Sequence, residues 1–140
     1  MSEARILSVE ELLKLDLVIP SYQRPYKWTE KNIRELILDI QKGIEDAKKY
    51  PNFKYRVGTV ILYQENDTKP YEIVDGQQRI LSFLLLKLCL NPDFTCSLLS
   101  ATFSDKVTLG NLHSNSDRIR EWCSSVDDGI KEAFDRALSE

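Results

Sequence analysis

One stretch of nine residues constrains the fold of this chain more than any other. Residues 71–79 read YEIVDGQQR and run directly into ILSFLLLKLCL at residues 80–90. The first four residues are typical of a short β-strand. Residues 80–90 are apolar on nearly every side, with Lys87 as the exception, which is typical of a helix that is buried all round. The sequence therefore predicts a strand over 71–74, a turn at 75–76, and a buried helix.

The run before this turn is the most β-prone part of the chain. Residues 55–63 read YRVGTVILY, and from Gly58 onward they are apolar on both faces. This pattern predicts a central strand covered from both sides, and Gly58 predicts a bulge or the close approach of a backbone or ligand. The polar turn at 64–70 predicts a hairpin of 55–63 with 71–74, and residues 17–19 predict a third strand.

Helical patterns occur before these strands. Ser8 and Glu11 form a capping box, which predicts a short helix that ends near Leu15. Thr29 begins a long amphipathic pattern. The apolar stripe of this second helix consists of Ile33, Leu36, Ile37, Ile40, Ile44 and Ala47.

The last third of the chain gives weaker signals. Residues 94–103 are ambiguous and could hold one further strand, and the polar residues 104–115 predict a loop. Residues 117–138 predict a helix, in one piece or broken near 124–125.

The length of 140 residues suits a single domain. The elements together predict an α+β fold, a small mixed sheet packed with helices and followed by a helical C-terminal part. Residues 1–92 would form the core, and residues 93–140 a helical extension of the same domain.

Charge and composition exclude several classes of protein. The net charge is −3 and the isoelectric point is near 5.3, so the chain has no global basic field and any contact with nucleic acid must be local. The longest apolar run, 80–86, is too short to span a membrane, and the N-terminus lacks the regions of a signal peptide. We therefore expect a cytoplasmic protein. The three cysteines have no CxxC spacing, which favours reduced thiols over disulfides or a zinc site.

A second unusual stretch, residues 19–28, reads IPSYQRPYKW. Two prolines make it an extended, stiff loop. Its aromatic residues interleave with Gln23, Arg24 and Lys27, and such a set can stack a base and pair a phosphate. The alternative is that Tyr22 and Trp28 fill an edge of the core while Arg24 pairs with a carboxylate.

The turn at 75–79 has the chemistry of a phosphate site. A helix N-terminus attracts phosphate through its N–H groups and dipole. Gly76 permits close approach, and Arg79 can bind two phosphate oxygens. Asp75 could cap the helix, bind Mg²⁺ or orient a water molecule. Gln77 and Gln78 could donate to phosphate or sugar, or position that water. The alternative is a structural turn with Asp75 as N-cap and an exposed arginine.

The two stretches together, in this order and about fifty residues apart, resemble the N-terminal domain of GmrSD-type restriction enzymes. That family carries an IPxYQRxYxW segment and a DGQQR segment after a hairpin, and its fold resembles ParB and sulfiredoxin. Both segments occur here without substitution at their defining positions, and Gly58 lies where the family has a glycine. The resemblance covers roughly residues 7–90. The resemblance implies a ParB/sulfiredoxin-like domain that binds and hydrolyses a nucleoside triphosphate (NTP), with Mg²⁺ at Asp75, in bacterial defence against phage DNA.

The resemblance also implies which residues act. Its phosphate site would comprise Tyr22, Gln23, Arg24, Asp75, Gly76, Gln77, Gln78 and Arg79. Hydrolysis would depend on Asp75 as organiser of metal or water, on Arg79 as phosphate clamp, and on Gln78. The implied partners are modified phage DNA and a separate nuclease domain or subunit. This chain has one histidine, His113, and no nuclease motif.

Two alternatives stay open. A non-catalytic DNA-sensing or regulatory module would use the 22–28 loop and the 75–79 turn to contact DNA phosphates, although the acidic isoelectric point favours a nucleotide. A sulfiredoxin-like thiol enzyme is disfavoured because no cysteine lies in or beside the turn. The family often has Leu-Thr-Thr after DGQQR, where this chain has Ile80-Leu81-Ser82.

Overall fold

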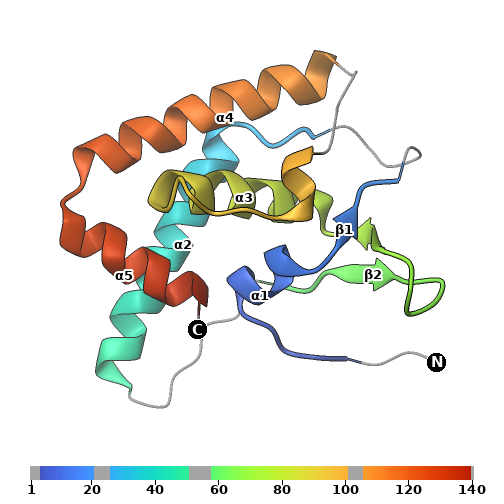
Figure 1. Cartoon of the computed structure of the whole chain (residues 1–140). Helices are drawn as coiled ribbons and strands as arrows, with labels where there is room; N and C mark the ends of the chain where they lie inside the picture. Colours follow the sequence, from blue (N-terminus) through green and yellow to red (C-terminus); the bar gives the residue numbers. More distant parts are fainter. Residues whose placement is uncertain (1–3, 21–25, 51–57, 101–105, 140) are drawn as a thin grey trace.

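Helix α3 (Gln77–Leu90) lies at the centre of the molecule, between a group of helices and a small sheet (Figure 1). The computed structural model describes residues 4–20, 26–50, 58–100 and 106–139. In chain order, the other elements are α1 (Val9–Lys14), β1 (Leu17–Val18), α2 (Glu30–Lys49), β2 (Ile61–Tyr63), β3 (Tyr71–Asp75), the 3-10 turn η1 (Ser97–Ser100), α4 (Lys106–Ser125) and α5 (Asp128–Ser139).

The sheet has the strand order β1-β3-β2. Strand β1 runs parallel to β3 and pairs Leu17 with Tyr71, whereas β2 runs antiparallel to β3 and pairs Leu62 with Ile73. The predicted capping box is present, because Ser8 Oγ accepts from Glu11 N at 3.1 Å and Glu11 Oε1 accepts from Ser8 N at 2.9 Å. This small mixed sheet with several helices confirms the predicted α+β class.

Strand β2 differs from its prediction. In the described part of the predicted 55–63 strand, only Ile61–Tyr63 is extended, and residues 51–57 lie outside the described residues. Strand β2 is an edge strand of this sheet, and Ile61 and Tyr63 are 52% and 53% exposed, so the strand is not covered on both faces. The prediction of a central strand covered from both sides is therefore wrong. Strand β3 is central, because β1 pairs with its other side.

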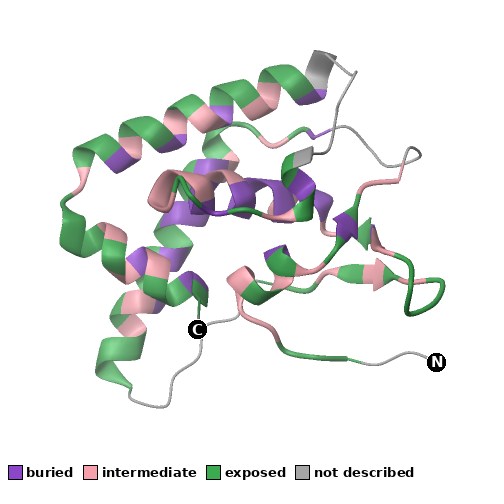
Figure 2. Ribbon diagram, in the orientation of Figure 1, coloured by how far each residue is buried: buried purple, intermediate pink, exposed green. Residues whose placement is uncertain are grey.

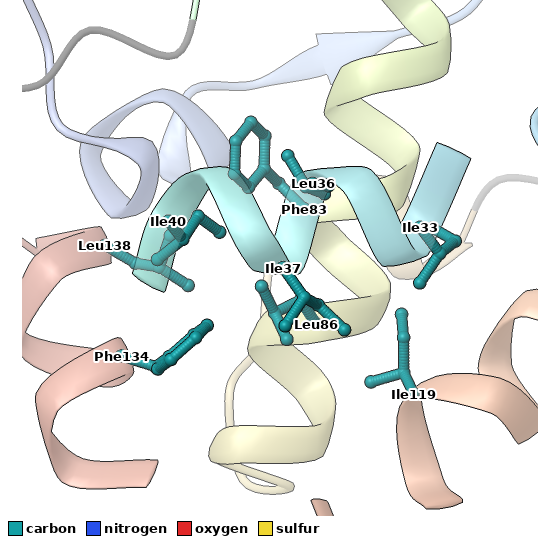
Figure 3. Packing of buried hydrophobic residues seen from close by; sticks show 9 residues of the cluster. All are labelled: Ile33, Leu36, Ile37, Ile40, Phe83, Leu86, Ile119, Phe134 and Leu138. Atoms are coloured by element: carbon teal, nitrogen blue, oxygen red, sulfur yellow. The ribbon is translucent and has the colours of Figure 1, made fainter. Parts of the chain in front are cut away.

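The helical side of the molecule encloses one hydrophobic cluster (Figure 3). The apolar stripe predicted for α2 is confirmed from Ile33 to Ile40, whose buried residues face α3, α4 and α5. Ile44 is partly buried against the same cluster, whereas Ala47 is exposed. The cluster consists of Ile33, Leu36, Ile37, Ile40, Phe83, Leu86, Ile119, Phe134 and Leu138. Among the described residues, no helix is long and apolar enough to cross a membrane.

A second cluster lies between α3 and the sheet. Helix α3 contributes Ile80 and Leu84 to this cluster, and Phe83 and Leu86 to the first one. Because α3 has a core on both sides, it must be apolar all round, as the sequence predicts. Figure 2 shows the result: α3 is largely buried, while α4 and α5 expose much of their surface.

Lys87, the charged exception among the apolar residues of α3, is buried as well. Only 2% of it is exposed. Its Nζ lies 2.6 Å from Asp135 Oδ1 and 3.7 Å from Glu10 Oε1, and 5.6 Å from the centre of the Phe94 ring. A buried ammonium group needs such partners, and here α5 and α1 supply them.

The C-terminal part is more helical than predicted. Residues 106–115 belong to α4, so the prediction of a loop over 104–115 is wrong where the structure describes it. Of the two forms predicted for residues 117–138, the helix broken near 124–125 is the one present, because α4 ends at Ser125 and α5 begins at Asp128. Asp127 Oδ1 caps α5 by accepting from Ile130 N at 2.9 Å. The described part of 94–103 contains η1 and no strand.

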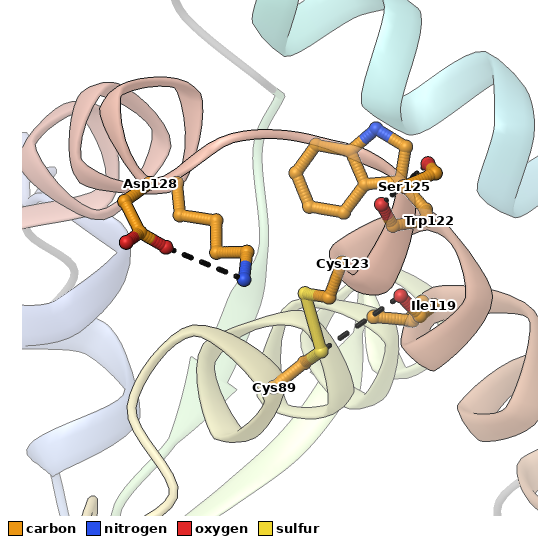
Figure 4. Close-up of a disulfide and its surroundings, with 7 residues drawn as sticks. Cys89, Ile119, Trp122, Cys123, Ser125 and Asp128 are labelled. Carbon is orange, nitrogen blue, oxygen red and sulfur yellow. Dashed lines mark hydrogen bonds and ion pairs between the residues drawn. A yellow bond between two sulfur atoms is a disulfide. The ribbon is translucent and has the colours of Figure 1, made fainter.

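Cys89 and Cys123 form a disulfide between α3 and α4 (Figure 4). Their Cα atoms lie 6.9 Å apart. The expectation of three reduced thiols is therefore wrong for this pair, and Cys96 is the free cysteine. A separation of 34 residues gives no sign of this pairing, because the packing of α4 on α3 brings the two positions together.

Candidate functional site

The candidate site begins where β3 passes into α3. Strand β3 ends at Asp75, and Gly76 is the N-cap of α3, so Asp75 does not hold that position. Gly76 O accepts the first helical hydrogen bond from Ile80 N at 3.0 Å. The Asp75 side chain is exposed, and its Oδ1 accepts from Gly76 N at 3.0 Å. One carboxylate oxygen therefore fixes the turn from outside.

Gly76 is required by this geometry. Its φ is 99° and its ψ is 10°, in the left-handed region that side chains disfavour. A Cβ atom at this position would also lie 2.5 Å from Val60 Cγ1 and 3.3 Å from Val60 Cα. Both the backbone conformation and the close approach of the preceding segment therefore exclude larger residues from the turn.

Arg79 lies against a second glycine of the same region. The backbone of Gly58 has a φ of 132°, and a Cβ atom there would overlap Nη1 of Arg79 and lie 2.9 Å from Cζ. A close approach is present at Gly58 as predicted, but the approaching group is the side chain of Arg79 and not another backbone or a ligand. The side chain of Arg79 is partly exposed, so it can serve both the fold and a ligand.

Gln78 joins the two motifs. Its Oε1 accepts from the backbone N–H groups of Lys27, at 2.6 Å, and Trp28, at 3.2 Å. These residues belong to the IPSYQRPYKW stretch, about fifty positions earlier in the chain. The structure thus brings the end of the first motif onto the first turn of α3. Tyr22, Gln23 and Arg24 lie outside the described residues.

Gln77 differs from Gln78 in its surroundings. It is only 6% exposed, so its carboxamide lies inside the protein and not in the open turn. Asp75, Gly76, Gln78 and Arg79 are the residues of the DGQQR segment that are at least partly accessible.

Tyr26 is fully buried beside this turn. Its hydroxyl lies 2.6 Å from Ser82 Oγ and accepts from Asn115 Nδ2 at 2.8 Å. Burial raises the pKa of the Tyr26 hydroxyl above its ordinary range, while the bonds with Ser82 and Asn115 act in the opposite direction. Tyr26 is therefore a neutral hydrogen-bonding residue at physiological pH.

Helix α4 contributes residues that sequence reasoning missed. Thr108 Oγ1 accepts from Tyr26 N at 2.8 Å, Asn111 Nδ2 donates to Tyr26 O at 2.9 Å, and Asn115 Nδ2 donates to Trp28 O at 2.8 Å. The spacing of these polar residues, three and four apart, is a helical signal, but it carries no hydrophobic periodicity. In the sequence, Ser82 interrupts an apolar run and lies where the related family often has threonine.

The site offers little to a metal ion on its own. In the described ranges, no group of three or more histidine, cysteine, aspartate or glutamate residues could hold a metal. Asp75 is a single exposed carboxylate, which fits a Mg²⁺ ion that takes its other ligands from phosphate and water. His113 is 81% exposed on α4, with Nε2 3.4 Å from Asp117 Oδ2, and belongs to the surface.

A comparison with protein families gives one match over most of the chain. The model of a family described as GmrSD restriction endonuclease, N-terminal domain, matches residues 7–138. The match extends beyond residue 90 and includes α4 and nearly all of α5. No curated protein was found to match the chain.

Proposed function

The chain belongs to the family of N-terminal domains of GmrSD restriction endonucleases, and from this premise we propose that it binds an NTP at the 75–79 turn and hydrolyses it within a restriction system. One observation carries the proposal. The left-handed Gly76, the N-terminus of α3 and the Arg79 guanidinium occur together at one partly accessible turn. Backbone amides at a helix start, with a nearby guanidinium, suit phosphate.

Each accessible residue of the turn has a role in this proposal. Gly76 lets a phosphate group approach the backbone, where the positive end of the α3 dipole attracts it. Arg79 binds phosphate oxygens and offsets their charge. Gln78 ties the site to residues 26–28 through its oxygen. Buried Gln77 supports the turn from inside.

Hydrolysis in this proposal uses Asp75 to orient a water molecule. The water oxygen forms a bond to the terminal phosphorus while the bond from that phosphorus to the bridging oxygen breaks. The products are a nucleoside diphosphate and inorganic phosphate, and the proton of the water passes through the Asp75 carboxylate to solvent. Mg²⁺, when bound by Asp75 and the phosphates, supplies further charge neutralisation.

The remaining expectations are part of the same proposal. Tyr22, Gln23 and Arg24 would complete the phosphate site, and the attachment of residues 26–28 to α3 supports this. A ParB/sulfiredoxin-like arrangement would underlie the fold. Residues 1–92 would be its nucleotide-binding core, and residues 93–140 an extension of the same domain. The partners would be modified phage DNA and a nuclease domain or subunit, in the cytoplasm.

One observation favours the DNA-sensing alternative. The side chain of Lys27 is exposed, while its backbone is fixed to Gln78 beside the turn. An exposed cation on a backbone held at the 75–79 turn could bind a DNA phosphate. Gel-shift measurements with plain and modified DNA, on the wild type and on Lys27→Ala, separate this alternative from nucleotide binding.

The deciding experiment measures thermal unfolding and phosphate release with ATP, GTP, CTP and UTP, each with and without Mg²⁺. A nucleotide at 100 times its Kd adds about 2.7 kcal/mol to the free energy of unfolding, which raises Tm by several degrees. Arg79→Ala should abolish this increase. Arg120→Ala removes an arginine of α4 that is 74% exposed, and should behave like the wild type.

Either of two results would contradict the proposal. The first is that no nucleotide raises the Tm of the wild type. The second is that Arg79→Ala binds nucleotide as well as Arg120→Ala does. Binding without phosphate release would keep the site and remove the hydrolysis step.

A further inference from the structure

Residues 26–28 are held between two helices through their backbone. Five backbone polar groups of this segment bond to side chains: Tyr26 N and O and Trp28 O to residues of α4, and Lys27 N and Trp28 N to Gln78 of α3. Strands or helices usually satisfy such groups with other backbone groups. Here two helices satisfy them with side chains, which fixes the position of the segment.

A chain of buried hydrogen bonds runs from α4 to α3 through Tyr26. Ser82 Oγ donates to Gln78 O at 2.8 Å, so Ser82 accepts from the Tyr26 hydroxyl at 2.6 Å. The Tyr26 hydroxyl in turn accepts from Asn115 Nδ2 at 2.8 Å. The direction of every bond is therefore determined, from Asn115 through Tyr26 and Ser82 to the Gln78 carbonyl.

The bonds also close a ring. Gln78 accepts hydrogen bonds at two places. Its backbone carbonyl accepts from Ser82, which is bonded to Tyr26, and its side-chain oxygen accepts from the N–H groups of Lys27 and Trp28. Tyr26, Ser82 and Asn115 are all 0% exposed. Buried networks of this kind hold their members rigidly, because a broken bond leaves an unsatisfied polar group.

Asn115 anchors this ring from outside. Both hydrogens of its Nδ2 are used, one by the Tyr26 hydroxyl and one by Trp28 O. Its Oδ1 is buried and has no hydrogen-bond partner within the described part of the chain. Burial of this oxygen without a partner is unfavourable for folding. The two hydrogen bonds that the Asn115 amide donates offset this cost, and an aliphatic residue could not donate them.

We propose that Asn115 is a positioning residue of the nucleotide site: through Tyr26 and Ser82 it fixes Gln78, and with it the first turn of α3. This rests on the proposed function for its effect on nucleotide, but the positioning of Gln78 stands by itself. Residue 115 lies 36 positions beyond Arg79, on a helix that contributes nothing to either motif.

The test compares Asn115 with an exposed arginine of the same helix. Asn115→Ala removes the bonds to the Tyr26 hydroxyl and to Trp28 O, whereas Arg120→Ala removes a side chain that is 74% exposed and contacts Asp117. Tyr26→Phe breaks the chain through Ser82 and leaves the bond to Trp28 O in place. The NMR signal of the Lys27 amide proton reports its 2.6 Å bond to Gln78 Oε1. We expect this signal to move upfield in Asn115→Ala and in Tyr26→Phe, and to stay in place in Arg120→Ala.

Nucleotide titration of the same proteins gives the second measurement. Asn115→Ala and Tyr26→Phe should each weaken binding about tenfold, with little further loss in the double variant because both break one chain. Arg120→Ala should stay within about twofold of the wild type. The inference is overturned if Arg120→Ala and Asn115→Ala move the Lys27 signal equally, or if neither moves it. Absence of nucleotide binding in the wild type would instead refute the proposed function, and the Lys27 signal would still decide the positioning.

Discussion

The guanidinium of Arg79 occupies the space that a side chain at residue 58 would fill. A Cβ atom at Gly58 would overlap Nη1 and lie 2.9 Å from Cζ. Gly58 of the β-prone run and Arg79, the last residue of DGQQR, therefore lie in direct contact. The absence of a side chain at Gly58 keeps Arg79 beside the turn, where phosphate would bind.

Gly58→Ala should displace Arg79 and weaken nucleotide binding as strongly as Arg79→Ala does. The arginine can swing away, so the main cost to folding is the positive φ of 132°, of order 1–3 kcal/mol. Binding is measured by titration and stability by urea unfolding. Gly110→Ala is the control, because no atom lies within 4 Å of a Cβ there and alanine favours helix by about 0.5–1 kcal/mol. Unchanged binding in Gly58→Ala would contradict the placement of Arg79.

Gly76→Ala should cost more stability than Gly58→Ala. Its φ is 99°, and the added Cβ meets Val60 Cγ1 at 2.5 Å and Val60 Cα at 3.3 Å, and the backbone atom cannot swing away. Strain and overpacking together predict a loss of about 2–4 kcal/mol in urea unfolding. Adding Val60→Ala removes the contact with Cγ1 but leaves those with Cβ, at 2.9 Å, and Cα, and should not restore the wild-type turn. Full recovery in the double variant would show that the backbone is not strained.

The sequence predicts the parts of this fold that depend on apolar periodicity or local capping. The stripe of α2, the capping box at Ser8 and the all-round apolarity of α3 are examples. It does not predict the role of α4, because the side of α4 that faces Tyr26 carries Thr108, Asn111 and Asn115. Polar side chains that bind a backbone give no hydrophobic pattern, so the sequence of residues 104–115 predicts a loop.

The same reason explains what was missed in the site. Long-range pairing decides which strand is central, and neither the pairing of β1 with β3 nor that of Cys89 with Cys123 leaves a local signal. The contact of Gln78 with Lys27 and Trp28 likewise joins residues about fifty positions apart. The resemblance predicts that both segments share one site, and the structure shows the Gln78 side chain that joins residues 27 and 28 to the turn.

Asp135→Asn should destabilise the protein more than Lys87→Met. Lys87 is 2% exposed and its Nζ lies 2.6 Å from Asp135, so loss of the carboxylate leaves a buried cation with only the more distant Glu10. We expect a loss of about 1–3 kcal/mol, below the range for fully buried pairs because Asp135 is 42% exposed. Methionine fills a similar volume without charge and should be nearly neutral. Urea unfolding of both variants checks the order, and the reverse order would contradict the ion pair.

Reduction of the Cys89–Cys123 disulfide should lower the stability of the purified protein. The cross-link closes a loop of 34 residues, which by chain entropy corresponds to about 3–4 kcal/mol. Thermal unfolding with and without dithiothreitol should show a lower Tm for the reduced wild type and no such difference for Cys123→Ser. Cys96→Ser, which removes the free thiol, should keep the wild-type response. An equal Tm for oxidised and reduced protein would exclude a stabilising cross-link.

Tyr26 should contribute to the free energy of unfolding, and this contribution should be lost at high pH. Burial raises the pKa of its hydroxyl above the ordinary value near 10, against the smaller opposite effects of Ser82 and Asn115. The folded state therefore keeps a proton that the unfolded chain releases at about pH 10. The contribution is complete below this pH and falls as the pH rises through the folded-state pKa.

Tyr26→Phe has no proton to lose, so its free energy of unfolding should decline less between pH 8 and 11 than that of the wild type. Urea unfolding at a series of pH values measures both declines. Tyr63→Phe removes a hydroxyl from a residue that is 53% exposed, and should retain the wild-type decline. Deprotonation removes the hydrogen bond that the Tyr26 hydroxyl donates to Ser82, whereas its oxygen can still accept from Asn115. An identical decline in the wild type and Tyr26→Phe would show that Tyr26 is not sealed from solvent, and the ring of hydrogen bonds would lose its central member.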